Sequence, residues 1–296
     1  MIELKYSSYG TCYFEKENSV YLSGRKNRVI DLKSGKLTAV FGNIESIHPK
    51  VSSSGRYIAL PNTYNGIEVI DRMNHNQRQF MYTIDKHHVS MTDHCAWHKK
   101  REMLAFSTTE NMFTVDMSQP DIINHVFSFQ VLNSIKCHQE RIEFIKSFDI
   151  IDNHIIMICY RSPEPCFLAS ISLIDDKMQI MEYYQQVDCP DFVIFDQKDG
   201  YYLLRNFRDI THYSSFEKKD ILSVEAGSYI SVSQNGMLLA VSLYPYRKIV
   251  NVYNLQSFKQ VLSIPVDNII TSISFSDESH YLLISGKHPL LVECNY

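Results

Sequence analysis

The chain has 296 residues, of which 45% are hydrophobic and 21% charged, a composition typical of a folded globular protein rather than a disordered one. Its 29 basic and 33 acidic residues give a net charge of −4, so bulk charge favours neither nucleic acid nor an anionic membrane as a partner. No run approaches the roughly 18 apolar residues of a membrane span, and the first ten residues, with an acid at Glu3, do not resemble a signal peptide. We therefore expect a cytoplasmic protein.

Seven cysteines are scattered along the chain without a CxxC pair. In a protein without an export signal, such cysteines are typically reduced thiols that pack as small apolar side chains. The sequence therefore predicts no disulfide framework. Cys166, which follows two prolines in RSPEPC (161–166), is expected to be a loop cysteine with no histidine placed to activate it.

One pattern recurs seven times: turn residues followed by a short apolar strand rich in β-branched and aromatic side chains. In chain order the occurrences are EKENSVYL (15–22), SSSGRYIAL (52–60), HKKREMLAF (98–106), DIIDNHIIMI (149–158), DQKDGYYLL (196–204), SQNGMLLAV (233–241) and SDESHYLLI (276–284). The strands are expected to start at Ser19, Arg56, Glu102, His154, Tyr201, Met237 and His280. A period of about 40–45 residues with several strands per unit predicts the blades of a β-propeller.

In five units a further strand is expected to end in an apolar residue followed by Asp or Asn. These pairs are Ile30/Asp31, Ile70/Asp71, Val115/Asp116, Ile174/Asp175 and Tyr253/Asn254. The series resembles the degenerate repeats of the WD-repeat (WD40-like) β-propeller family, in which a Trp-Asp pair ends the third strand of each blade. None of the five pairs has the tryptophan.

The predicted fold is all-β, a seven-bladed β-propeller that occupies residues 1–296 as one domain; six blades are the alternative, because the fourth unit is long. The expected blades are 9–42, 43–85, 86–130, 141–186, 187–225, 226–264, and 265–296 completed by 1–7. The last unit offers only three strands, and MIELKY at the amino terminus alternates apolar residues as a strand does. This segment is expected to supply the missing outer strand and to close the ring, which removes exposed sheet edges.

Residues 85–100, DKHHVSMTDHCAWHKK, contain four histidines and a cysteine that invite a metal-site interpretation. The WD-repeat resemblance implies instead a structural role for His88, which lies nine residues before Trp97 of the inner strand. If Cys95–Trp97 is a strand, with about 3.3 Å per residue, His94 and His98 lie too far apart to share an ion. We expect no metal and no cofactor here.

No phosphate-binding glycine loop, HExxH helix or GxSxG elbow occurs in the sequence. The expected inner strands carry few acids or histidines away from their ends. We therefore expect no enzyme. The alternative is a propeller enzyme or small-ligand binder that uses the central tunnel, and converging histidines and carboxylates in that tunnel would favour it.

The WD-repeat resemblance places the segments between the second and third strands on one face of the ring. Nine of the 29 basic residues fall in these segments, against three acids. Arginine and aromatic residues are also favoured at the energetic centres of protein interfaces. The partner-binding candidates are Arg25, Arg28, Arg161, Arg205, Phe207, Arg208, Tyr244, Tyr246, Arg247 and Lys287.

These features favour a monomeric, non-catalytic interaction module that presents one face to a protein partner, with an acidic segment as the favoured ligand. Acidic residues in the blade-entering loops temper that charge preference; they are Asp85, Asp93, Asp188, Asp191 and Asp267. A second possibility is an inhibitor or immunity-type protein that masks a toxin or enzyme, and no residue selects it.

Overall fold

The computed structural model describes most of the chain, in many short stretches. These are residues 2–3, 12–16, 19–22, 27–34, 36–41, 50–62, 66–71, 73, 78–82, 95–107, 111–128, 144–160, 165–175, 177–185, 188–195, 200–205, 209–214, 217–223, 229–233, 236–243, 247–267, 269–276 and 280–294. The regular elements in these stretches are β-strands, joined by turns. None of them holds a helix that could span a bilayer.

The strands form seven antiparallel sheets of four strands each. The first four sheets contain β2 (Cys12–Lys16), β3 (Ser19–Leu22), β4 (Asn27–Asp31) and β5 (Leu37–Phe41); β6 (Lys50–Val51), β7 (Tyr57–Asn62), β8 (Gly66–Asp71) and β9 (Arg78–Tyr82); β10 (Cys95–Trp97), β11 (Met103–Ser107), β12 (Asn111–Asp116) and β13 (Ile123–Ser128); and β14 (Phe144–Ile151), β15 (His154–Tyr160), β16 (Cys166–Ser172) and β17 (Met178–Tyr184).

The remaining three sheets continue the same inner-to-outer order. They contain β18 (Pro190–Phe195), β19 (Gly200–Arg205), β20 (Asp209–Ser214) and β21 (Glu217–Ser223); β22 (Tyr229–Val232), β23 (Leu238–Ser242), β24 (Ile249–Asn254) and β25 (Lys259–Pro265); and β26 (Ile270–Phe275), β27 (Tyr281–Gly286) and β28 (Leu290–Glu293) with β1 (Ile2–Glu3). In the last sheet Ile2 pairs with Leu291 and Glu3 with Leu290, so the two ends of the chain share one sheet.

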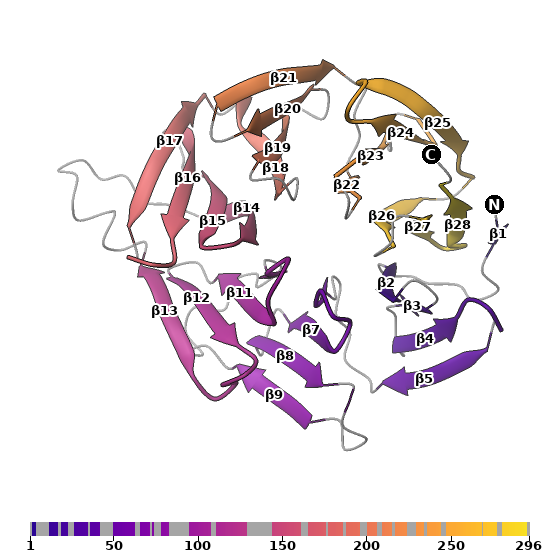
Figure 1. Ribbon diagram of the computed structural model, residues 1–296, viewed down its shortest axis with the longest axis horizontal. Helices are drawn as coiled ribbons and strands as arrows, with labels where there is room; N and C mark the ends of the chain where they lie inside the picture. Colours follow the sequence, from indigo (N-terminus) through magenta and orange to yellow (C-terminus); the bar gives the residue numbers. More distant parts are fainter. Residues whose placement is uncertain are drawn as a thin grey trace.

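The repeat pattern located the second strand of every sheet within one residue. These strands begin at Ser19, Tyr57, Met103, His154, Gly200, Leu238 and Tyr281. Figure 1 shows the sheets standing side by side around a common centre, with the inner strands nearest to it. The all-β, propeller-type prediction is therefore confirmed.

The apolar core is divided among the contacts between neighbouring sheets. For example, Cys95 and Trp97 pack with Tyr57 of the second sheet, whereas Ala96, which lies between them in β10, packs with Ile145 of the fourth. Successive side chains of a strand point to opposite faces, so each sheet supplies both of its neighbours. Val20 and Ile30 of the first sheet also pack against Leu283 and Leu291 of the last.

Turns between the first and second strands share one cap. The side chains of Ser52, Ser233 and Ser276 accept hydrogen bonds from backbone N–H groups at the start of the next strand, at 2.8–3.2 Å. In two of these turns a glycine adopts a positive φ, 72° at Gly55 and 66° at Gly236, which explains the glycine in SSSGRY and SQNGML.

The recurrent Asp or Asn at the end of the third strand has a turn-capping role. Asp31 Oδ1 accepts the N–H of Ser34 at 2.7 Å, Asp116 Oδ1 that of Ser118 at 2.8 Å, and Asn254 Oδ1 that of Gln256 at 3.0 Å. Side-chain oxygens of Asp and Asn commonly accept such bonds from backbone two or three residues on.

The expected pair Ile174/Asp175 is wrong by three residues. β16 ends at Ser172, which pairs with His154 as Asp31 pairs with Ser19, so Ser172 occupies the capping position. Its Oγ accepts the N–H of Ile174 at 3.3 Å, and the Ile174 side chain is 76% exposed in the turn. A serine can cap the turn as Asp does, and this is why a search for Asp missed it.

The expectation of reduced cysteines is wrong for one pair. Cys166 and Cys189 form a disulfide, with their Cα atoms 6.1 Å apart, whereas Cys95, Cys159 and Cys294 are buried and take no part in a disulfide. Cys166 is the first residue of β16, not a loop residue, and it is fully buried. The pairing arises because the start of β16 lies beside the residue that precedes β18 in the next sheet, and sequence spacing gives no sign of that contact.

Candidate partner-binding face

The strand order fixes which end of each sheet carries the candidate residues. In four antiparallel strands that run from the inside outward, the segment between the second and third strands lies at the end where the first strand begins. We call the surface formed by these ends the recognition face. Its connecting segments are 23–26, 63–65, 108–110, 161–165, 206–208, 243–248 and 287–289.

Of the ten candidate residues, the structure describes the side chains of two, Arg247 and Lys287, and both are exposed. Arg28 and Arg205 are placed by their backbone alone: they lie inside β4 and at the end of β19, not in the connecting segments where the sequence pattern put them. The other candidates lie outside the described residues, as does His88; they are Arg25, Arg161, Phe207, Arg208, Tyr244 and Tyr246.

The segment that carries Arg247 is held at both ends. Its N–H donates to the carbonyl of Leu243 at 2.8 Å, and the N–H of Leu243 donates to the carbonyl of Ile249 at 2.9 Å. The neighbouring Lys248 reaches the segment that leads into the seventh sheet, where its Nζ donates to the carbonyl of Asp267 at 3.2 Å. Arg247 is therefore an exposed basic side chain on a fixed backbone, which lowers the conformational entropy lost on binding.

Lys287 provides a second basic side chain on the adjacent sheet. It follows β27 directly, and the next segment returns through buried Pro289 into β28. Arg247 and Lys287 thus occupy equivalent connecting segments of the sixth and seventh sheets. Both of these positions are basic, whereas exposed Asp188 and Asp267, in the segments that enter the fifth and seventh sheets, place acidic side chains on the same face.

Trp97 has structural contacts. The indole lies in β10, is 6% exposed and stacks on Tyr57, with ring centroids 6.1 Å apart. Its Nε1–H donates to the carbonyl of Lys50 in β6 at 2.9 Å. The side chain therefore joins the inner strands of the second and third sheets.

His98 is buried and hydrogen-bonded through both ring nitrogens. Its Nδ1 accepts the N–H groups of Lys100 and Arg101 at 2.9 and 3.0 Å, so it caps its turn as serine does elsewhere. Because Nδ1 accepts, the ring hydrogen sits on Nε2, which donates to the carbonyl of Asp152 at 2.8 Å. Burial lowers the pKa of His98, and the neutral ring matches both contacts.

The residues after His98 extend this contact into a charged junction between the third and fourth sheets. Lys99 Nζ lies 3.2 Å from Asp149 Oδ2, and Lys100 Nζ lies 3.1 Å from Asp152 Oδ1. Residues 98–100 of the histidine-rich stretch 85–100 thus join the third and fourth sheets. The described residues contain no cluster of three potential metal ligands.

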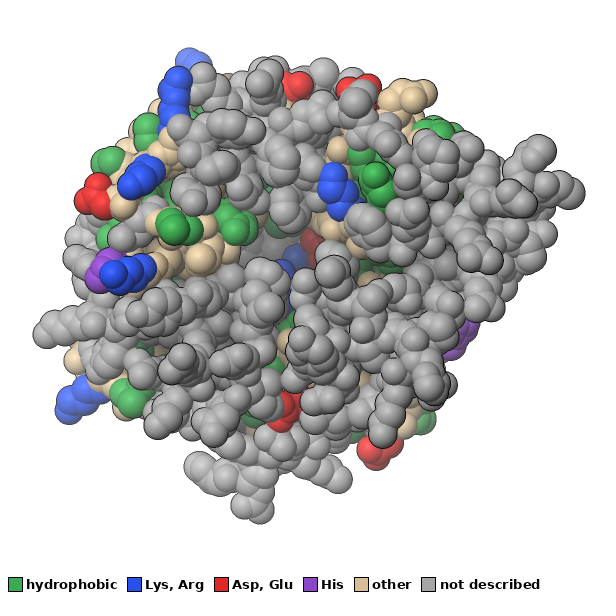
Figure 2. Space-filling view, turned by 180° about the vertical axis from the view of Figure 1, so that it is seen from behind, with side chains coloured by type: hydrophobic (Ala, Val, Ile, Leu, Met, Phe, Trp, Pro, Cys, Tyr) green, Lys and Arg blue, Asp and Glu red, His purple; other side chains and the backbone are tan. Residues whose placement is uncertain are grey.

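The inner strands determine what a ligand in the central tunnel would meet. Figure 2 shows that the face opposite to the one seen in Figure 1 is hollowed at its centre, with basic and acidic side chains visible in its depth. The partly exposed side chains described on inner strands are Lys50, Val51, Lys146, Ile194, Tyr229, Ile230, Ser231, Val232, Thr271, Ser274 and Phe275. Asp149, the carboxylate described on these strands, is buried and paired with Lys99.

This architecture is shared with solved β-propellers. The β-propeller domain of Myceliophteria thermophila Cps50 (Swd1) matches 100% of this chain and 99% of its own, with a TM-score of 0.73 and 9% identity. The WD40 repeats of RRP9 match 99% of this chain and 96% of their own, with a TM-score of 0.73 and 10% identity. A chain of Kuenenia stuttgartiensis hydrazine synthase matches 98% of this chain and 95% of its own, with a TM-score of 0.66 and 7% identity.

The chain therefore has the fold of WD40-type β-propeller domains. At such low identities the likeness concerns the fold alone, and propellers serve many functions. No protein-family model and no curated relative matches the sequence.

Sequence reasoning missed the role of His98, although a signal was present. In the repeat alignment HKKREML lies over SSSGRYI, so His98 occupies the position of the capping Ser52. Sequence reasoning also missed the burial of the Glu68 carboxyl group in β8 and the Cys166–Cys189 disulfide, because each depends on a neighbouring sheet.

Proposed function

We propose that the seven sheets are the blades of one closed seven-bladed ring, which forms a single domain from residue 1 to 296. Two observations support closure: the pairing of β1 with β28, and the packing of Val20 and Ile30 against Leu283 and Leu291. Closure leaves no blade with an uncovered face. It also gives the recognition face a fixed geometry.

We further propose that the protein is a non-catalytic, cytoplasmic interaction module whose recognition face binds an acidic segment of a protein partner. The observation that carries this is the exposure of Arg247 and Lys287 at equivalent positions of adjacent sheets. In the sequence, the connecting segments as the strands bound them hold seven basic residues against two acids, Glu110 and Glu164. Complementary charge favours association rate and specificity.

Two further considerations favour a binding module over an enzyme. The partly exposed side chains described on the inner strands are lysines, hydroxyl residues and apolar residues, and the histidines and carboxylates most used in acid–base catalysis are not among them. A chain of the mitotic checkpoint complex has the same fold, with a TM-score of 0.72, 9% identity and coverage of 99% of this chain and 89% of its own. A rigid ring of blades suits presentation of loops within an assembly.

The test is charge reversal on one face only. Arg205, Arg208 and Arg247 are changed together to Glu, and capture of partners from native lysate is measured by affinity purification with mass spectrometry. The control changes Lys33, Lys36 and Lys259, exposed at the opposite ends of the sheets, to Glu. We expect the first variant to lose the captured partner and the control to retain it, with matching circular dichroism spectra.

Retention of the same partner by the folded Arg205/Arg208/Arg247 variant would refute binding through this face. The identity of the captured protein separates the alternatives that remain. Capture of one toxin or enzyme whose activity then falls would assign a masking role. Capture of several members of one assembly would assign a scaffold role.

A further inference from the structure

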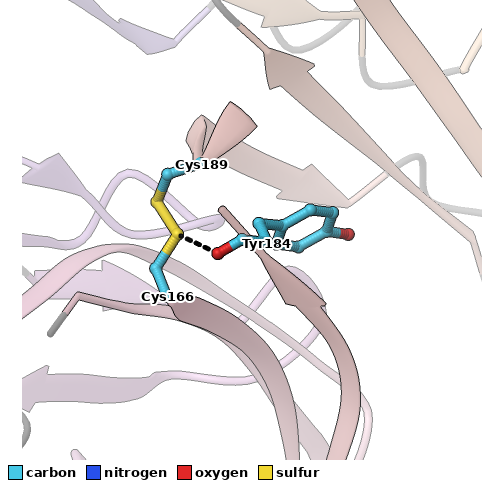
Figure 3. The surroundings of a disulfide bond; sticks show 3 residues. All are labelled: Cys166, Tyr184 and Cys189. Carbon is cyan, nitrogen blue, oxygen red and sulfur yellow. Dashed lines mark hydrogen bonds between the residues drawn. A yellow bond between two sulfur atoms is a disulfide. The ribbon is translucent and has the colours of Figure 1, made fainter. Parts of the chain in front are cut away.

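The disulfide lies at the recognition face. Cys166 begins β16 directly after the connecting segment 161–165, and Cys189 directly precedes Pro190, the first residue of β18. The bond thus joins the third strand of the fourth sheet to the start of the inner strand of the fifth (Figure 3). Both cysteines stand at the end of their sheet that carries recognition segments.

The surroundings accommodate both oxidation states of the pair. Both side chains are buried in one apolar cluster with Ile156, Leu203 and Tyr213, at 0% exposure for Cys166 and 3% for Cys189. Cys166 Sγ lies 3.7 Å from the carbonyl oxygen of Tyr184, the contact drawn as a dashed line in Figure 3. A disulfide sulfur carries no hydrogen, but a reduced Cys166 thiol could donate to that same oxygen.

We propose that Cys166 and Cys189 form a reversible thiol–disulfide clamp that adjusts partner binding at the recognition face. The regulatory part rests on the function proposed above. The oxidised clamp fixes the end of segment 161–165 against the start of the fifth sheet. Reduction frees the two attachment points to move apart, so a partner that contacts both must order them on binding, which weakens affinity.

The exchange chemistry balances with a small-molecule disulfide as the oxidant. One cysteine, as thiolate, attacks the small disulfide, forms a mixed disulfide and releases one small thiol. The second cysteine attacks the mixed disulfide at the protein sulfur, which forms the Cys166–Cys189 bond and releases the second small thiol. The two protons leave with the released thiols. In a reducing compartment the pair rests as thiols and oxidises when the thiol pool does.

The seam between the two sheets does not depend on the disulfide alone. Glu182 Oε2 in β17 accepts hydrogen bonds from Tyr184 Oη at 2.5 Å and from Tyr213 Oη in β20 at 3.0 Å. Tyr213 in turn stacks on Tyr201, with ring centroids 4.9 Å apart. Reduction is therefore expected to loosen the cysteine end of the seam while the fold persists.

The first test needs no partner. The full chain is equilibrated with oxidised or reduced glutathione, denatured in excess iodoacetamide, then reduced, labelled with N-ethylmaleimide and mapped by mass spectrometry. We expect Cys166 and Cys189 to carry the maleimide label only after oxidation. Cys95, Cys159 and Cys294 are internal controls that should carry the first label throughout. First-label modification of Cys166 and Cys189 after oxidation, or a persistent glutathione adduct, would overturn the clamp.

The second test measures consequence. Hydrogen exchange of the peptides around β16 and β18 is compared between oxidised chain, reduced chain and the Cys166→Ser variant, and partner affinity is measured on the same samples. Faster exchange and several-fold weaker binding are expected in the reduced chain and in the variant. Equal exchange in all samples refutes the clamp as a mechanical link. Faster exchange with unchanged affinity refutes only the regulatory role of the clamp. If no sample captures a partner, including the oxidised wild-type chain, the proposed function is refuted but the clamp is not.

Discussion

Glu68 is a carboxyl group in an apolar seam, and its replacement should stabilise the protein. It lies in β8 between Leu60 of β7 and Met81 of β9, on the strand face that it shares with Ile70. Ile70 and Leu60 pack with Val29 of the first sheet. Glu68 is 2% exposed, and neither carboxyl oxygen has a hydrogen-bond partner among the residues that the structure describes.

The magnitude follows from that unpaired burial. A buried polar group without a partner costs about 1–3 kcal/mol. Glu68→Met keeps an unbranched side chain of similar length and removes the polar atoms, so we expect a gain of about 1–3 kcal/mol in unfolding free energy at pH 7. In urea, this gain shifts the midpoint upward by roughly 0.5–1 M.

The gain also depends on pH in a defined direction. Burial raises the pKa of Glu68 above its ordinary value of 4.5, so the folded state keeps this proton to a higher pH than the unfolded state does. The part of the destabilisation that comes from ionisation is therefore absent below about pH 4.5 and grows as pH rises through the raised folded pKa, whereas the cost of burying the neutral carboxyl is independent of pH. Glu68→Gln keeps a buried polar group that cannot ionise. The unfolding free energy of this variant relative to wild type should therefore increase between pH 5 and pH 8.

The assay is equilibrium urea unfolding followed by the fluorescence of Trp97, the sole tryptophan, at several pH values. Asp121→Asn, at an exposed acid, serves as the control and should leave the wild-type pH dependence unchanged. A Glu68→Met variant that is less stable than wild type, or a Glu68→Gln difference that is constant with pH, would refute the argument.

Three further predictions concern the other described contacts. His98→Ala should cost about 2–4 kcal/mol, since it leaves two N–H groups and the Asp152 carbonyl unpaired, and His98→Ser should cost less because serine restores the cap. The pKa of His98 is lowered in the folded state, so the unfolding free energy of the wild type should fall as pH drops below about 6.5. The urea midpoint of His98→Ser should lack this pH-dependent fall. Trp97→Phe keeps the stack on Tyr57 but leaves the Lys50 carbonyl unpaired, so thermal unfolding monitored by circular dichroism should report a loss of about 1–3 kcal/mol. The disulfide between Cys166 and Cys189, which are 23 residues apart, should raise the free energy of unfolding by about 3 kcal/mol. An unchanged urea midpoint after reduction of the mapped disulfide would contradict this.

The parts of this fold that local sequence encodes were predictable. A turn followed by an apolar strand is written in consecutive residues, which is why the start of all seven second strands was located within one residue. The third-strand caps are equally local, and the error at Ile174 came from expecting Asp or Asn where serine also serves.

Contacts between sheets were not predictable in the same way. In β8, Ile67 and Val69 pack toward the third sheet, whereas Glu68 lies on the face of Ile70, which packs with Val29 of the first sheet. Cys166 and Cys189 are brought together only when the fourth and fifth sheets pack. The basic bias of the recognition face is visible in the sequence, whereas its geometry depends on where segments such as 243–248 are anchored.

Each of the seven apolar clusters is formed by side chains from two neighbouring sheets. A fragment encoding one unit would thus have no interior around which to fold, and removing a unit would strip two neighbours at once. Shortened products of this gene should be cleared by proteolysis rather than accumulate as smaller working versions.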